Sequence, residues 1–258
     1  MSTTTEKKIA LVTGANRGIG YETVKLLASS HPEMHVLLCA RSPSLGDEAV
    51  ETLSSQGLSN VEALNLDITS DEFITAAYNY IKSAFGHLDV LIHNAGSIGD
   101  AALSEAGANF RSIAKAEFDT NFFSAGQITE TFLPLLEASP WGPRIVFVSN
   151  TLSSLTYASD SSSPFYMSRL PLYRSAKTAL NMLMLYYAAV GREKSKLVEK
   201  DREWKVNATC PGYVATRMNG WRGPGKVEWG AVNVVRLAVL DRDGETGTFS
   251  SKEGPLPW

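Results

Sequence analysis

The sequence predicts a single α/β domain in which helices cover both faces of a seven-stranded, mostly parallel sheet. Three observations lead to this prediction. Short, continuous apolar runs alternate with helical segments from residue 9 onward, and such runs are typical of strands that are buried on both faces. A glycine-rich turn follows the first of these runs directly. No shift in composition marks a second domain, so we expect one domain over residues 1–258.

The predicted strands and helices alternate regularly along the chain. Six apolar runs follow the first one (residues 9–12), at 35–39, 61–66, 88–92, 145–148, 204–210 and 247–250. Helical periodicity separates several of them, for example over residues 46–53 and again over residues 73–84. This order is the doubly wound, Rossmann-type pattern, which binds its ligands at the carboxyl ends of the strands. The polar stretch YASDSSSP indicates a surface insertion near residues 151–172.

Composition and charge argue against several functional classes. The 24 Lys and Arg residues and 27 Asp and Glu residues give a net charge of −3, which argues against a nucleic-acid binder. No apolar run approaches the roughly 20 residues of a membrane span, and the N-terminus lacks the pattern of a secretory signal. Two cysteines exclude a disulfide framework and favour a reducing compartment, so we expect a cytoplasmic protein. The four histidines show no plausible metal-binding pattern, and we expect no metal.

Three glycines mark the turn after the first predicted strand. Gly14, Gly18 and Gly20 follow the pattern G-x-x-x-G-x-G and open a helix. Glycines at such places let the backbone turn tightly and approach a pyrophosphate, which then sits at the helix N-terminus. The pattern therefore predicts a dinucleotide-binding site.

Two arginines indicate which dinucleotide binds there. Arg41 follows the second predicted strand, where an NAD site usually carries an acidic residue, and Arg17 lies inside the glycine-rich turn. Two guanidinium groups without a carboxylate favour the 2′-phosphate of NADP(H). The alternative is that both arginines are solvated surface side chains.

Tyr173 and Lys177 are four residues apart and share one face of a predicted helix. A phenol with a pKa of about 10 is a poor acid–base catalyst at pH 7. A neighbouring ammonium group favours the phenolate, so we expect Lys177 to lower the pKa of Tyr173. The pair thus indicates acid–base chemistry, although an isolated pair of this kind is more often a buried tyrosine beside an exposed lysine.

Five motifs stand in order along the chain: Thr13-Gly14-x-x-x-Gly18-x-Gly20, Asn94-Ala95-Gly96, Asn121, Tyr173-x-x-x-Lys177 and Pro211-Gly212. Together they resemble the classical short-chain dehydrogenase/reductase family over essentially the whole chain. The pair Ala40-Arg41, the enlarged segment before Tyr173 and the ending TGTFSSKEGPLPW are most similar to the NADPH-dependent carbonyl reductases. The resemblance implies hydride transfer from NADPH to a carbonyl carbon, with Tyr173 protonating the carbonyl oxygen as general acid.

The resemblance also implies roles for individual residues. Lys177 would hold the nicotinamide ribose, and Asn121 would link that lysine through water to solvent. Asp67 and Ile68 match the pair that contacts adenine, and Val214 and Thr216 match positions beside the nicotinamide carboxamide. The expected cofactor-binding residues are Gly14, Asn16, Arg17, Gly18, Ile19, Gly20, Arg41, Asp67, Ile68, Asn94, Ala95, Gly96, Tyr173, Lys177, Pro211, Gly212, Val214 and Thr216.

The end of the fifth predicted strand departs from the family pattern. The family usually has two serines there, of which the second is catalytic, but this chain has Ser149 followed by Asn150. Ser149 could be shifted into the site, Asn150 could donate through its amide, or Ser153 or Ser154 could fold back. We expect one of the first two to face the nicotinamide and the other to face away. Our candidate catalytic residues are Asn121, Ser149, Tyr173 and Lys177, with Asn150 close behind Ser149.

These observations predict an NADPH-dependent oxidoreductase that reduces a small ketone or aldehyde to an alcohol. Three loops, at 97–108, 152–172 and 218–227, should shape the substrate pocket, and their aromatic side chains favour an apolar substrate, unless they simply pack the loops. Alcohol oxidation or imine reduction on the same cofactor is the alternative chemistry. A non-catalytic NADP-binding regulatory module is the alternative class. The oligomeric state stays open between monomer and homo-oligomer.

Overall fold

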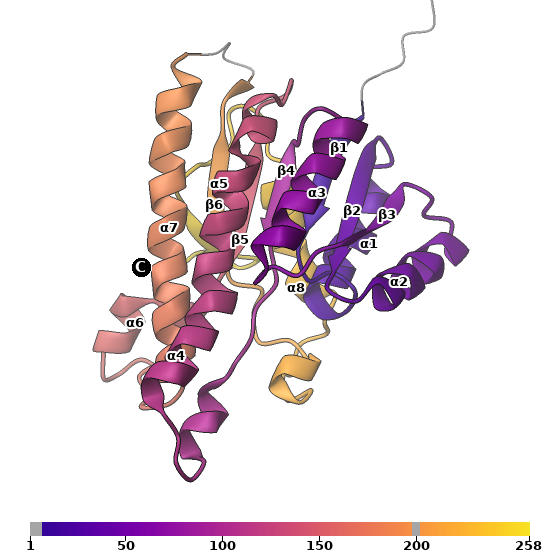
Figure 1. Ribbon diagram of the computed structural model, residues 1–258. Coiled ribbons are helices and arrows are strands. Elements are labelled where there is room, and N and C mark those ends of the chain that lie inside the picture. Colours follow the sequence, from indigo (N-terminus) through magenta and orange to yellow (C-terminus); the bar gives the residue numbers. More distant parts are fainter. Residues whose placement is uncertain (1–6, 198–201) are drawn as a thin grey trace, which may run out of the picture.

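An eight-stranded sheet runs through the computed structural model, which describes residues 7–197 and 202–258 (Figure 1). The strands are β1 (Lys8–Val12), β2 (Met34–Ala40), β3 (Val61–Asn65), β4 (Val90–His93), β5 (Arg144–Val148), β6 (Lys205–Thr209), β7 (Phe249–Ser251) and β8 (Gly254–Pro255). Their order in the sheet is β3-β2-β1-β4-β5-β6-β7-β8. The strands from β3 to β7 are parallel to their neighbours, and β8 pairs antiparallel with β7. The predicted α/β fold class is confirmed, with one strand more than expected.

Helices cover both faces of the sheet, as the continuous apolar runs predicted (Figure 1). The helices are α1 (Gly18–Ser30), α2 (Pro43–Ser55), α3 (Asp71–Ala84), α4 (Phe110–Phe118), α5 (Ser124–Glu137), α6 (Leu155–Ser159), α7 (Pro171–Ser195) and α8 (Trp229–Ala238). Short helical turns add η1 (Asp100–Ser104), η2 (Asp119–Phe123), η3 (Thr151–Ser153) and η5 (Arg217–Asn219). Buried side chains of α1, α2 and α8 form one core, and those of α3, α5 and α7 form the other.

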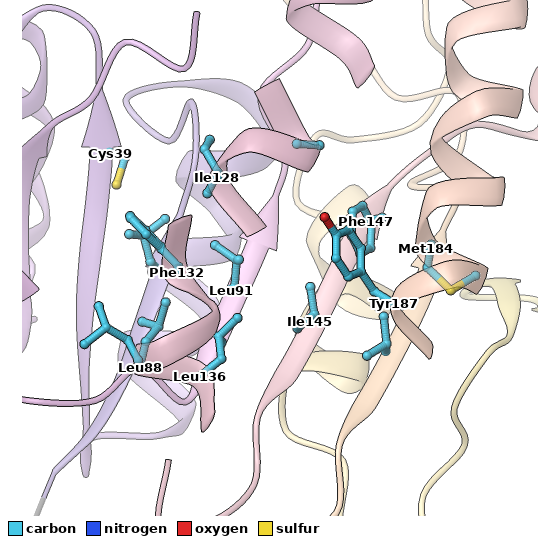
Figure 2. Close-up of a cluster of buried hydrophobic side chains, with 14 of the residues drawn as sticks. Cys39, Leu88, Leu91, Ile128, Phe132, Leu136, Ile145, Phe147, Met184 and Tyr187 are labelled. Atoms are coloured by element: carbon cyan, nitrogen blue, oxygen red, sulfur yellow. The ribbon is translucent and has the colours of Figure 1, made fainter. Parts of the chain in front are cut away.

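The core under α5 and α7 holds the long helix α7 firmly on the sheet. Figure 2 shows Phe132 and Leu136 of α5 near Leu91 of β4, and Tyr187 of α7 near Phe147 of β5. The rings of Tyr187 and Phe147 are nearly parallel, with centroids 6.2 Å apart. Full burial of one such side chain stabilises a fold by about 1.5–3 kcal/mol. The packing therefore fixes the position of α7, which carries Tyr173 and Lys177 near its start.

The carboxyl ends of the parallel strands meet at one edge of the sheet, and the predicted motifs lie there. The glycine-rich turn follows β1, Arg41 follows β2, and Asn94 follows β4. Ser149 follows β5, and Pro211 comes two residues after the end of β6. The fold thus brings segments that are far apart in the sequence to the edge where doubly wound sheets bind ligands. No helix within the described ranges is long and apolar enough to cross a lipid bilayer.

Candidate active site

The glycine loop (residues 13–20) depends on the absence of side chains at two positions. Gly14 has a φ of +61°, a left-handed conformation that side chains disfavour. A Cβ on Gly20 would lie 2.4 Å from Asn94 Nδ2 and 2.7 Å from the Gly14 carbonyl oxygen, which is too close for any other residue. The loop leads directly into α1 at Gly18. Free N–H groups at that helix start suit a pyrophosphate.

Thr13 and Asn94 join two of the predicted motifs. Thr13 Oγ1 accepts hydrogen bonds from the backbone N–H groups of Asn94 and Ala95, both at 3.0 Å. In return, Asn94 Nδ2 donates to the carbonyl oxygens of Thr13, at 2.8 Å, and Gly14, at 3.1 Å. These bonds hold the glycine loop against the turn after β4, so both would meet the same cofactor.

The two arginines that favour NADP(H) leave their guanidinium groups exposed. Arg17 stands just before α1 and Arg41 just after β2, and neither guanidinium bonds to another side chain or backbone group in the described ranges 7–197 and 202–258. The backbone brings their segments together, because Ala15 donates its N–H to the Cys39 carbonyl oxygen at 2.8 Å. Asp67, in contrast, accepts from the N–H and hydroxyl of Thr69, and Ile68 beside it is half-buried.

Tyr173 lies in the first turn of α7 and is 6% exposed. Burial raises the pKa of its phenol, the nearby Cys210 and Glu117 raise it further, and a hydrogen bond from the Asn150 side chain lowers it. The net direction is upward, so the expectation that Lys177 brings this pKa down is wrong: desolvation is the larger effect. At neutral pH Tyr173 is therefore a protonated phenol, the form that a general acid needs.

Lys177 lies one turn further along α7 and is 4% exposed. Its Nζ donates to the Val148 carbonyl oxygen at 3.0 Å and lies 5.9 Å from the centre of the Tyr173 ring. Burial lowers the pKa of Lys177 to about 8, while the negative charge of Glu117 acts in the opposite direction. Lys177 is thus mostly an ammonium group at pH 7, close to the pH at which it loses its charge.

Asn121 approaches Lys177 across Gly96. Asn121 sits in η2, a π-helical turn between α4 and α5, and such turns are frequent at functional sites. A Cβ on Gly96 would lie 2.8 Å from Asn121 Oδ1 and 3.4 Å from Lys177 Nζ. The missing side chain at Gly96 therefore leaves room for both the Asn121 amide oxygen and the Lys177 ammonium group to lie close to this position. The structure brings these three predicted residues into one place.

Ser149 and Asn150 face different surroundings, as expected for adjacent strand residues. Ser149 Oγ lies 3.2 Å from Ser153 Oγ and donates to the Lys177 carbonyl oxygen at 3.5 Å, so its hydroxyl belongs to a buried network beneath α7. Asn150 Oδ1 accepts from the Leu152 N–H at 2.9 Å, so the amide nitrogen is the end of this side chain that can donate to another group. The Asn150 side chain is the one that hydrogen-bonds to Tyr173. These contacts connect Asn150, our second choice, with Tyr173, and the Ser149 hydroxyl with Ser153 and the Lys177 backbone.

Ser153 and Ser154, the serines that could have folded back into the site, form hydrogen bonds with other groups. Ser153 Oγ donates to the Asn150 carbonyl oxygen at 2.6 Å and accepts from Asn181 Nδ2 at 2.8 Å. Ser154 Oγ accepts from the Tyr157 N–H at 3.1 Å and caps the start of α6. Both hydroxyls therefore stabilise the chain after β5, and neither points back to Tyr173.

The turn after β6 closes the site on the other side. Gly212 has a φ of +81°, and its N–H donates to Cys210 Sγ at 3.4 Å. Val214 is buried and forms a bridge to Gly225, while Thr216 caps η5 together with Asn219. These contacts hold the Pro211–Thr216 segment in one defined conformation after β6.

Two buried carboxylates at the site were not predicted. Asp100 accepts from the N–H groups of Leu172, at 2.8 Å, and Tyr173, at 3.0 Å, and so caps α7 from a distant loop. Glu117 accepts from Asn121 Nδ2 at 2.8 Å. Neither position belongs to a recognisable motif, and only their long-range contacts reveal them. The described residues hold no group of three or more His, Cys, Asp or Glu side chains that could bind a metal ion.

The chain is similar to known proteins over most of its length. The family model for short chain dehydrogenase matches residues 8–226. The chain is 35% identical over 274 residues to the Short-chain dehydrogenase/reductase ATR10 of Stachybotrys chlorohalonatus, covering 98% of this chain and 94% of that protein. Salutaridine reductase from Papaver somniferum has a similar structure, with a TM-score of 0.79 and 27% identity over 95% of this chain and 100% of that chain. NADPH-bound carbonyl reductase from chicken fatty liver shares the fold, with a TM-score of 0.80 and 24% identity over 98% and 99% of the two chains.

Proposed function

Because the chain belongs to the short-chain dehydrogenase family of oxidoreductases, we propose that it reduces an apolar ketone or aldehyde to an alcohol with hydride from NADPH. One observation carries the proposal. A buried, protonated Tyr173 lies beside a buried Lys177 and is hydrogen-bonded by the Asn150 side chain, at the edge of the sheet that holds the glycine loop. This is an arrangement for giving a proton to an oxygen atom that gains negative charge.

The residues present fit NADP(H). The N–H groups at the start of α1 would hold the pyrophosphate, next to the glycine loop that Gly14 and Gly20 allow to pack closely against the turn after β4. Arg17 and Arg41 would bind the 2′-phosphate, and no carboxylate follows β2 directly to repel it. Tyr173 and Lys177 would hold the nicotinamide ribose. When bound, NADPH supplies the hydride that goes to the carbonyl carbon.

The protein's own groups would handle the carbonyl oxygen. The Asn150 amide nitrogen donates a hydrogen bond to that oxygen, in the role that the family gives to a serine. Tyr173 then transfers its phenolic proton to the oxygen, which completes the alcohol and leaves a phenolate. The ammonium group of Lys177 stabilises the phenolate, and a proton from solvent restores the phenol by way of Lys177 and Asn121. Ser149 supports this arrangement from beneath α7 through its bond to the Lys177 carbonyl oxygen.

The loops near the site favour an apolar substrate. Tyr157 and Phe165 pack together with their ring centroids 5.2 Å apart, and Tyr213, Met218 and Trp221 are largely exposed. Exposed apolar side chains beside a polar reaction site commonly mark a substrate-binding surface. Salutaridine reductase, one of the similar proteins, is named for a reduction, which also supports the proposed direction.

A panel of aliphatic and aromatic ketones and aldehydes, incubated with NADPH or NADH, tests the proposal. We expect loss of NADPH absorbance with apolar members of the panel, a much slower reaction with NADH, and none with the Tyr173→Phe variant. The reverse reaction with the matching alcohols, and a set of imines, test the alternative chemistries. Tight NADPH binding without turnover of any of these compounds would contradict the proposal and support a regulatory module.

A further inference from the structure

Glu117, in the last turn of α4, carries a carboxylate whose burial needs an explanation. Its side chain is 2% exposed, and burying a charge is costly unless hydrogen bonds or opposite charges compensate for it. Its Oε2 accepts from the Gly99 N–H at 2.7 Å and the Ser97 hydroxyl at 3.3 Å, and its Oε1 accepts from Asn121 Nδ2 at 2.8 Å. Burial raises the pKa of this carboxyl, whereas the hydrogen bonds from Gly99 and Ser97 and the positive charge of Lys177 act in the opposite direction and favour the carboxylate.

The first effect of this carboxylate is on the orientation of the Asn121 amide. An amide side chain has a donor end and an acceptor end, and a carboxylate accepts hydrogen bonds from the donor end. Because Asn121 Nδ2 donates to Glu117 Oε1, Asn121 Oδ1 points to the opposite side. There it accepts from the Ser97 N–H at 3.3 Å and lies beside Gly96, where Lys177 Nζ also approaches. The backbone of Ser97 adds to this preference, since its carbonyl oxygen also accepts from Nδ2 at 3.1 Å.

The second effect is on the charge of Lys177. Burial disfavours the ammonium group, and Glu117 is the acid whose negative charge acts against that effect. The other titratable groups around Lys177 do not help. His93 of β4 is neutral, because burial and Lys177 lower its pKa to about 3, and Tyr173 of α7 is a neutral phenol flanked by Cys210. Asp100 of η1 acts on Glu117, where it adds to burial, the main cause of the raised pKa of that carboxyl.

We propose that Glu117 is a positioning residue of the reductase site, which orients the Asn121 amide and holds Lys177 in its ammonium form. The inference rests on the proposed function, because it gives Glu117 a part in returning a proton to Tyr173 after each reduction. The electrostatic interaction between Glu117 and Lys177 that the inference invokes does not depend on the identity of the substrate. The experiments below therefore measure that coupling separately from turnover.

The first experiment follows the Lys177 Cε resonance by NMR in protein labelled with ¹³C-lysine, with Lys177→Met for its assignment. Glu117→Gln keeps the shape of the side chain and removes its charge. An opposite charge nearby typically shifts a pKa by about 1–3 units, so we expect the Lys177 titration midpoint to fall by about one pH unit or more. Glu117→Asp, which keeps the charge, should restore most of the difference. An unchanged midpoint in folded Glu117→Gln would overturn the proposal.

Glu130→Gln serves as the matched control. Like Glu117, Glu130 is a helical glutamate that accepts a side-chain hydrogen bond, in its case from the Tyr187 hydroxyl at 2.9 Å, but it is exposed and lies on α5 outside the site. Its replacement should leave the Lys177 midpoint where it is. If Glu117→Gln does not fold, the wild-type protein still provides the test: the Lys177 resonance should show a second inflection at the pH where Glu117 ionises. A single inflection would count against the proposal.

Turnover gives the second readout. Loss of the Glu117 charge favours both neutral Lys177 and the Tyr173 phenolate, so the alkaline fall of kcat should move to lower pH in Glu117→Gln and stay in place in Glu130→Gln. A purely structural role predicts lower stability or lower kcat at every pH, with no shift of the profile. If the wild-type protein reduces nothing, the proposed function fails, but the NMR titration still decides whether Glu117 controls the charge of Lys177.

Discussion

The two ends of the candidate site are built differently. At the cofactor end, around Gly14 and Gly20, the backbone forms the site, whereas at the reaction end, around Tyr173 and Lys177, buried side chains form it. The cofactor end needs glycines because a Cβ would collide with neighbouring atoms, and its two arginines remain exposed. The reaction end consists of ionisable groups that burial shifts away from their usual pKa values. The cofactor end depends on the shape of the backbone, which requires glycines at fixed spacings and is therefore visible as a local sequence pattern. The reaction end depends on the surroundings of each group, which distant parts of the chain supply.

The largest expected effect comes from removing the proton donor at the reaction end. Tyr173→Phe keeps the ring and its packing but deletes the phenolic proton. We expect turnover to fall by roughly 10²–10⁴-fold, the range typical of lost general acid catalysis, while NADPH binding by fluorescence titration stays within a few-fold of wild type. Near-normal turnover would remove Tyr173 from the mechanism, and lost binding would show that the two ends of the site are not separable.

The next effect distinguishes Asn150 from Ser149. Loss of a pre-positioned donor to a developing oxyanion costs about 10²–10³ in turnover, so we expect this loss in Asn150→Ala and a smaller one in Ser149→Ala. Asn150→Ser should recover much of the activity, because a hydroxyl can donate to the same oxygen. Steady-state kcat for the three variants checks this order. Damage confined to Ser149→Ala would instead support the shifted serine.

At the cofactor end, Arg41→Asp tests the choice of dinucleotide. A hydrogen bond to a charged group contributes about 1.5–3 kcal/mol, so its loss should weaken NADPH binding by roughly 10–100-fold, and the new carboxylate adds repulsion. NADH binding should change much less, because NADH lacks the 2′-phosphate. Parallel titrations with the two cofactors measure the difference, and Arg111→Asp, on exposed α4, is a charge-matched control. Equal losses for both cofactors would mean that Arg41 does not bind the phosphate.

The smallest effect concerns stability rather than chemistry. His93 donates or accepts a hydrogen bond with Thr129 at 2.9 Å and stacks on Phe147, and burial lowers its pKa to about 3. The folded pKa is below the unfolded value of about 6.5, so the stabilisation is present above pH 6.5 and is lost as the pH falls toward 3. Between pH 7.5 and pH 5 the free energy of unfolding should drop by about 2 kcal/mol more in wild type than in His93→Gln. Urea unfolding at the two pH values measures this, and equal drops would contradict it.

The sequence predicted the sheet, the helices on both faces and the gathering of the motifs, because each depends on patterns that are local in the chain. It did not predict β8, since two residues, one of them a proline, show no strand pattern. It also could not choose between Ser149 and Asn150, because the direction of a side chain at a strand end depends on what packs beside it. The contacts of Ser149 with the chain beneath α7 and of Asn150 with Leu152 separate them.

The pKa of Tyr173 was predicted in the wrong direction for a related reason. Helical spacing placed Lys177 on the same face, but it did not show how strongly the phenol is desolvated. Asp100 and Glu117 escaped prediction because single acidic residues in loops and helix ends are usually solvated. Their contacts join segments that are between 4 and 73 residues apart, and the longest of these are invisible to any local pattern.

The bonds from Asp100 to the start of α7 bear on attempts to change the substrate range. The loop that begins at Ser97 approaches the expected substrate pocket and is therefore an obvious target for mutagenesis. Asp100 binds the backbone of Tyr173 itself, so a change at this position would displace the proposed proton donor together with the loop. Residues 104–110 are exposed and lie beyond that attachment. A library of variants aimed at new carbonyl compounds should randomise the outer part of the loop and keep Asp100 fixed.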